Sequence, residues 1–121
     1  MQYLNEIKNK HITVLGLGVT GLGIVRFLLS QSIQPYVVDS RENPLGVDWL
    51  NQHAPQLKTH FGDLENAALS ACDMIIISPG LGLKTPAIAK AINAGVEVIG
   101  DVELFARINS KPVVAVTGSN G

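Results

Sequence analysis

Short, nearly continuous runs of apolar residues recur along the chain, with polar or helix-patterned stretches between them. Runs that are apolar on both faces are typical of strands buried inside a parallel sheet. They predict strands at residues 11–15, 35–39, 73–78, 96–100 and 112–117, and a brief, more polar strand is expected at 58–62. The segments between them predict helices at 22–29, 47–53, 64–71, 85–95 and 101–108. This alternation indicates an α/β fold, a Rossmann-like doubly wound parallel sheet with right-handed crossovers.

The ends of the later helices are marked by residues that favour helix boundaries. Thr85 is a suitable N-cap, Pro86 fits the first helical position, and Gly95 follows the last turn. Asp101 is expected to cap the helix that follows, and Arg107 lies near its carboxyl end, where a cation complements the helix dipole.

A glycine-rich turn joins the first strand to the first helix. Gly16, Gly18 and Gly21 fit the spacing G-x-G-x-x-G, which turns a strand sharply and lets backbone N–H groups approach a phosphate. The phosphate would lie at the helix N-terminus, where unpaired donors and the helix dipole favour an anion. The alternative is a turn that serves only close packing of strand and helix.

Two further loops are expected at the same edge of the sheet, because ligands of such sheets bind beyond the carboxyl ends of the strands. Asp39 ends the second strand, where it would meet a ribose hydroxyl or base N–H, or else cap the following loop. Arg41 would pair with a phosphate, carboxylate or base carbonyl, or remain solvated. The segment Ser78-Pro79-Gly80 either faces a nucleotide or is a plain turn.

Composition narrows the class of protein. The 121 residues are 46% hydrophobic, enough to bury the core of one domain. A net charge of −1 with no basic run argues against a nucleic-acid or membrane-surface partner. Neither a signal peptide nor a membrane-spanning apolar run is present, which makes the cytoplasm the expected location. The single cysteine, Cys72, is expected in the core, and the three histidines lack metal-ligand spacing, so no metal site is expected.

The last residues, Thr117-Gly118-Ser119-Asn120-Gly121, follow an apolar strand and begin as a phosphate-binding P-loop does. A complete P-loop would continue with Lys and then Ser or Thr. The segment is therefore either a flexible tail or the first half of an ATP site in a longer protein.

Together these segments resemble the N-terminal portion of a Mur ligase, specifically the MurD type, over essentially the whole chain. The resemblance rests on 16–21, 39–41, 78–80, 100–105 and 116–121, in family order. It implies a three-domain, ATP-dependent amide-bond-forming ligase of peptidoglycan synthesis, with Mg²⁺ as a further cofactor. In that family the carboxylate of UDP-N-acetylmuramoyl-L-alanine is phosphorylated by ATP, and the amine of D-glutamate then attacks the acyl phosphate.

The resemblance also implies roles for individual residues. Residues 1–100 would form the UDP-substrate-binding domain, and 101–121 a linker helix and the first strand of the ATPase domain. The diphosphate would meet Gly18, Val19 and Thr20; the uracil and ribose would meet Asp39, Ser40, Arg41, Ser78, Pro79 and Gly80. ATP would meet the partial P-loop at Thr117, Gly118, Ser119, Asn120 and Gly121. No catalytic residue and no tightly bound cofactor is expected within these 121 residues, which would bind substrate without catalysing ligation.

A different class of protein fits the first half of the chain. A G-x-G-x-x-G turn followed by Asp39 would serve the NAD(P)-binding domain of an oxidoreductase equally well on spacing alone. The sequence at Thr117–Gly121, which such a domain does not require, favours the ligase.

Overall fold

A single five-stranded sheet forms the centre of the computed structural model, which describes residues 2–78 and 85–109. The strands are β1 (Ile12–Leu15), β2 (Tyr36–Asp39), β3 (Thr59–Phe61), β4 (Met74–Ile77) and β5 (Glu97–Gly100). The helices are α1 (Gln2–Ile7), α2 (Val19–Ser30), α3 (Val47–His53), α4 (Pro86–Asn93) and α5 (Asp101–Asn109), with 3-10 turns η1 (Leu64–Asn66) and η2 (Leu69–Ala71).

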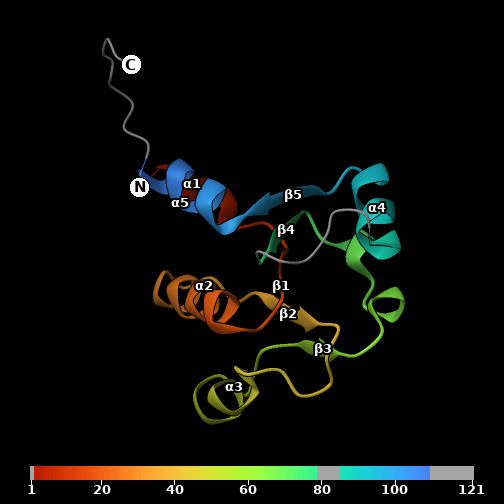
Figure 1. Cartoon of the computed structure of the whole chain (residues 1–121). Coiled ribbons are helices and arrows are strands. Elements are labelled where there is room, and N and C mark those ends of the chain that lie inside the picture. The colour runs from red at the N-terminus through yellow and green to blue at the C-terminus, as the bar shows by residue number, and fades with distance from the viewer. Residues whose placement is uncertain (1, 79–84, 110–121) are drawn as a thin grey trace.

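The strands lie in the order β3-β2-β1-β4-β5, and every neighbouring pair is parallel. From β1 the chain moves outward to β3 and then crosses back to β4, on the other side of β1 (Figure 1). The order of strands therefore reverses between β1 and β4, which is where open α/β sheets bind ligands. The predicted Rossmann-like parallel fold is confirmed.

Alternate residues of the central strands point to opposite faces of the sheet, as the pleat requires. Val14 and Ile76 belong to one buried cluster with residues of α1, α2, α3 and α5, whereas Leu15 and Ile77 belong to another with residues of η1, η2 and α4. Figure 1 shows α2 and α4 on opposite sides of the sheet. Two covered faces explain why every residue of the central strands β1 and β4 is buried and nearly all of them are apolar.

Most predicted elements are present, with ends shifted by one to three residues. The continuous helix predicted at 64–71 is wrong. The chain forms η1 and η2 there, separated by Ala68, whose backbone is left-handed at φ 56°. The carboxylate of Asp63 accepts a hydrogen bond from the backbone N–H of Glu65 and so caps η1. The strand predicted at 112–117 lies outside the described residues.

Helix α1 was not anticipated, because half of its six residues are polar and it lacks a long apolar pattern. It forms against α5, and Figure 1 shows the two helices side by side. Leu4 and Ile7 are buried, and Arg107 of α5 donates a hydrogen bond of 3.1 Å from Nη1 to the hydroxyl of Tyr3. Tertiary contacts rather than intrinsic propensity thus stabilise a helix this short. None of the helices within the described ranges has the length and apolar character needed to cross a membrane.

Candidate functional site at the carboxyl edge of the sheet

The glycine turn between β1 and α2 is fixed by backbone contacts that only glycine permits. Gly16 has φ 103°, in the left-handed region, and its N–H donates to the carbonyl of Val38 at 2.7 Å. A Cβ atom at Gly21 would overlap the Gly16 carbonyl oxygen. The third glycine of the motif therefore lets α2 pack directly against the end of β1. The tight-packing reading of the motif is thus correct as far as Gly21 is concerned, and it leaves the start of α2 free for a ligand.

The first turn of α2 favours an anion. Gly18 is the N-cap residue, and among the described residues no side chain caps this helix and no acidic residue occupies its first turn. The N–H groups of a first helical turn have no acceptors within the helix, and the helix dipole adds positive potential. Val19 is 77% exposed, so this helix start faces solvent.

The carboxylate of Asp39 connects this turn to the end of β2. Its Oδ2 accepts hydrogen bonds from the Leu17 backbone N–H at 2.7 Å and from Arg41 Nη2 at 2.8 Å. Its Oδ1 accepts from the Arg41 backbone N–H at 2.8 Å and from Arg41 Nε at 3.0 Å. Asp39 therefore caps its own loop, as one of the two sequence readings proposed, and at the same time holds the glycine turn in place.

These contacts determine the charge state of Asp39. The residue is only 2% exposed, and burial alone would raise its pKa. Hydrogen bonds from the Arg41 side chain and from the backbone N–H groups of Leu17 and Arg41 outweigh burial and hold the pKa of Asp39 below its ordinary value. The carboxylate is therefore ionised at neutral pH and paired within the chain.

Arg41 carries the positive charge of this pair to the mouth of the site. Its side chain is 59% exposed, although Nε and Nη2 bond to Asp39. Its Nη2 lies 3.8 Å from where a Cβ on Gly18 would stand. A guanidinium thus lies beside the N-cap of α2, where it adds to the positive potential of the helix start.

Ser78, at the end of β4, closes the other side of the glycine turn. Its hydroxyl donates to the Gly16 carbonyl at 3.2 Å, and its backbone N–H donates to the Leu15 carbonyl at 3.0 Å. Gly46 supports the turn from the loop before α3, because its N–H donates to the Leu17 carbonyl at 3.1 Å. A Cβ at Gly46 would lie 2.8 Å from Cγ of Leu17, which explains a glycine that the sequence reading did not single out.

The structure thus brings together the residues predicted at the ends of β1, β2 and β4. Gly18, Val19 and Thr20 form the helix start, Asp39 and Arg41 the adjoining ion pair, and Ser78 the far wall. Ser40 is exposed in the same loop as Arg41. Pro79, Gly80 and Thr117–Gly121 lie outside the described residues. The sequence did not predict the hydrogen bond from the Leu17 N–H to Asp39. The Arg two positions after Asp39 indicates at most the ion pair between Asp39 and Arg41.

This arrangement is suited to binding rather than to bond making. It offers backbone donors, a helix dipole and one guanidinium, all of which favour an anionic group. Within residues 2–78 and 85–109, no group of three or more His, Cys, Asp or Glu side chains is placed to hold a metal ion. Fold and site together define a Rossmann-like α/β domain with a glycine-rich turn at its topological switch point.

Comparison with known families narrows this class. Residues 10–100 match the family described as Mur ligase MurD-like, N-terminal domain. That match covers the whole sheet, from β1 to β5. The chain therefore belongs to the MurD-like family of Mur ligases, as its N-terminal domain.

Individual relatives support the assignment. The chain is 78% identical over 121 residues to the UDP-N-acetylmuramoylalanine--D-glutamate ligase of Pseudoalteromonas translucida, covering 100% of this chain and 27% of that enzyme. It is 53% identical over 118 residues to the enzyme of the same name from Haemophilus influenzae, covering 98% of this chain and 26% of the relative. It is 47% identical over 116 residues to the enzyme of the same name from Yersinia pestis, covering 96% of this chain and 26% of that relative. The chain thus spans about a quarter of the length of the curated relatives it matches.

Proposed function

We propose that the chain is the substrate-binding domain of a ligase that adds D-glutamate to UDP-N-acetylmuramoyl-L-alanine in peptidoglycan precursor synthesis. Membership of the MurD-like family and the printed names of the relatives support this assignment. The observation that carries it in the structure is the start of α2, which no side chain of the described residues caps, with Arg41 beside Gly18 at the switch point of the sheet. The protein would work in the cytoplasm, where its nucleotide substrates are made.

In this proposal the diphosphate of the substrate lies at the first turn of α2. Backbone N–H groups of Gly18, Val19 and Thr20 would donate to the phosphate oxygens, because no other residue described here caps that turn. The guanidinium of Arg41 would supply the charge that a diphosphate requires. The backbone N–H groups and the Arg41 guanidinium would thus bind the anion, although the net charge of the chain is −1.

The uracil and ribose would lie between the loops that follow β2 and β4. Ser40 and Arg41 offer exposed polar groups, and Ser78, followed by Pro79 and Gly80, would form the opposite wall. Asp39 has a different part, because its carboxylate is already engaged by Leu17 and Arg41. We assign it to holding the turn and orienting the guanidinium, so its effect on binding is indirect.

ATP and Mg²⁺ would bind elsewhere in a longer protein. The residues proposed for the phosphate-binding loop, Thr117–Gly121, and the strand before them lie outside the described part of the chain. We propose that residues 1–100 form the substrate domain and that 101–121 lead into the ATPase domain. The first part of that segment, α5, follows β5 directly and packs on the first domain, where Leu104 and Ile108 are buried in its core.

Calorimetric titration of the chain with UDP-N-acetylmuramoyl-L-alanine, UDP and NADH, under the same buffer and salt conditions, tests this function. We expect heat of binding with both uridine nucleotides and none with NADH. The variant Arg41→Gln removes the guanidinium beside the helix start. It should weaken UDP binding by about 1–3 kcal/mol, as expected for a charged hydrogen bond. Binding of NADH alone would contradict the proposal and favour an oxidoreductase domain.

A further inference from the structure

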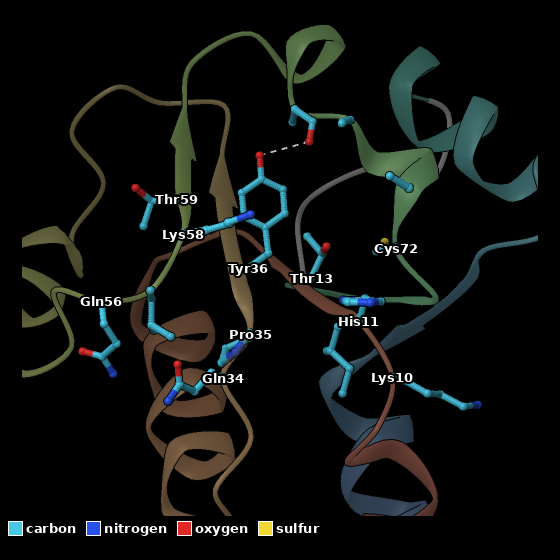
Figure 2. Close-up of a pocket in the computed structure, with 15 residues that line it drawn as sticks. Lys10, His11, Thr13, Gln34, Pro35, Tyr36, Gln56, Lys58, Thr59 and Cys72 are labelled. Atoms are coloured by element: carbon cyan, nitrogen blue, oxygen red, sulfur yellow. Dashed lines mark hydrogen bonds between the residues drawn. The ribbon is translucent and has the colours of Figure 1, made fainter.

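A hollow lies at the amino ends of the strands, at the edge of the sheet opposite the glycine turn. Its volume is about 820 Å³, within the range of roughly 300–1,000 Å³ that small-molecule sites occupy. Thr13 of β1, Tyr36 of β2 and Thr59 of β3 line it together with Cys72, just before β4 (Figure 2). The ladder pairs Thr13 with Tyr36, which places these side chains side by side on the sheet.

A polar atom without a partner lies in the wall of this hollow. Thr13 is 0% exposed, and within the described residues its hydroxyl oxygen has no hydrogen-bond partner. The hydroxyl lies close to the Cys72 thiol, whose pKa it lowers against the larger effect of burial, which raises the pKa. A buried hydroxyl left unpaired is costly, and such groups are uncommon in folded proteins.

The charged side chains that line the hollow are lysines, and both are positive. Lys10, His11 and Lys58 are basic, and none of the lining residues is Asp or Glu. Neither lysine forms an ion pair within residues 2–78 and 85–109. The carboxylate of Asp73, next in sequence to Cys72, accepts the backbone N–H of His11 at 2.8 Å. Lys10 and Lys58 therefore bring positive charge to the hollow, with the Asp73 carboxylate beside His11 as a nearby negative group.

An aromatic ring and apolar side chains complete the wall. The hydroxyl of Tyr36 donates to the Ala67 carbonyl at 3.0 Å, which fixes the ring at the side of the hollow (Figure 2). Leu57 and Ala68 contribute apolar surface nearby. A ligand that satisfies these features carries a negative group for the lysines and a flat apolar body for the tyrosine ring.

We propose that this hollow binds a small organic anion, an aryl or similarly flat apolar body that carries a phosphate or carboxylate, with Thr13 as its buried hydrogen-bond partner. The site is separate from the carboxyl edge and does not depend on the function proposed there. Thr13 distinguishes it from a surface collection of lysines, because valine has nearly the same shape and would fill the same place in the strand without an unpaired hydroxyl. Threonine therefore costs stability that a bound ligand recovers.

The test is a titration of the ¹⁵N-labelled chain with phenyl phosphate, followed in ¹H–¹⁵N spectra, with inorganic phosphate and phenol as separate arms. We expect saturable shifts at the amides of Thr13, Tyr36, Thr59 and Cys72, with tighter binding of phenyl phosphate than of either part alone. Thr13→Val should weaken that binding about threefold to tenfold, the effect of one hydrogen bond, while raising the urea midpoint. Lys58→Gln should also weaken it, whereas Lys90→Gln, outside the hollow, should not.

Two results would overturn the proposal. One is the absence of saturable shifts at these amides in the folded chain. The other is an unchanged affinity of Thr13→Val for phenyl phosphate, which would make the unpaired hydroxyl a feature of the fold alone. Shifts confined to the first turn of α2 would show that phenyl phosphate binds at the other edge, which contradicts this site and leaves the proposed function standing.

Discussion

Asp39 shows how one buried carboxylate organises the carboxyl edge of the sheet. Its two oxygens accept four hydrogen bonds, which join the end of β2 to the glycine turn and to Arg41. Its spacing from the glycines of the motif predicts an acidic residue at the end of the second strand, close to the glycine turn. Its actual partners depend on how the loop folds back, which spacing alone does not reveal.

Replacing Asp39 with Asn tests this role through stability and its dependence on pH. Asp39→Asn should lower the free energy of unfolding at pH 7 by about 1–3 kcal/mol, because buried donors lose a charged acceptor. Little of this belongs to the ion pair itself, since the Arg41 side chain is 59% exposed. Urea unfolding followed by circular dichroism measures the change.

The pH dependence has a definite sign. The pKa of Asp39 is lowered in the fold, so its ionised form contributes stability above the unfolded-chain pKa of about 3.9 and loses it as pH falls through the folded value. The gap between the chain and Asp39→Asn should therefore be greatest near neutral pH and close in acid below about pH 4. Glu42→Gln, an exposed change in the same loop, is the control. A gap that does not shrink in acid would contradict the assignment.

Ala68 carries backbone strain that a single change should relieve. Its φ of 56° lies in the left-handed region that alanine seldom adopts, and its side chain is exposed. Ala68→Gly should raise the free energy of unfolding by about 0.5–1 kcal/mol. Ala67→Gly, at φ −85° and fully buried, should lower it. The urea midpoints of the two variants measure the difference, and a shared direction of change would refute the strain.

At the scale of elements, the glycine turn and the start of α2 form one unit. The turn is shaped by Gly16 and Gly21, and no side chain of residues 2–78 or 85–109 caps the first turn of α2. Helices are usually capped by side chains, so an uncapped start beside a guanidinium is consistent with a ligand as the missing partner.

Two glycines of α2 offer a matched pair of substitutions. Gly21→Ala would place a methyl group onto the Gly16 carbonyl oxygen, which must move the helix away from β1. We expect a loss of at least about 2 kcal/mol, as for an overpacked core site. At Gly23 no atom lies within 4 Å of the added methyl, so Gly23→Ala should gain about 0.5–1 kcal/mol from helix propensity. Thermal unfolding of both variants separates these outcomes, and tolerance of Gly21→Ala would contradict the close packing.

The strands were the most predictable elements, because a continuous apolar run has few alternatives in a chain of this pattern. The segment at 64–71 was not, since its residues permit a helix and only tertiary packing, with Ala68 in a left-handed conformation, divides it into η1 and η2. Helix α1 was also missed, because its stability comes from α5, which lies far away in sequence. The local sequence pattern thus predicts elements whose own residues are apolar enough to indicate burial. It fails for elements that form only by packing against a segment distant in sequence.

At the scale of the whole molecule, the parallel sheet separates two edges of different character. The carboxyl edge gathers Gly18, Arg41 and Ser78 around one helix start, and sequence spacing predicted that these loops meet. The amino edge holds the hollow around Thr13 and Tyr36, which no motif indicated. Its residues come together only through the register of the strands, and the strand order was not predictable from the chain.

The central claim is that the carboxyl edge holds the UDP end of the substrate. The most direct measurement is a UDP titration of the ¹⁵N-labelled chain, with the shifts assigned residue by residue. We expect saturable shifts at the amides of Gly18, Val19, Thr20, Ser40 and Arg41, which surround the start of α2. If UDP at saturation left these amides unshifted in the folded chain, the site proposed at the glycine turn would be wrong.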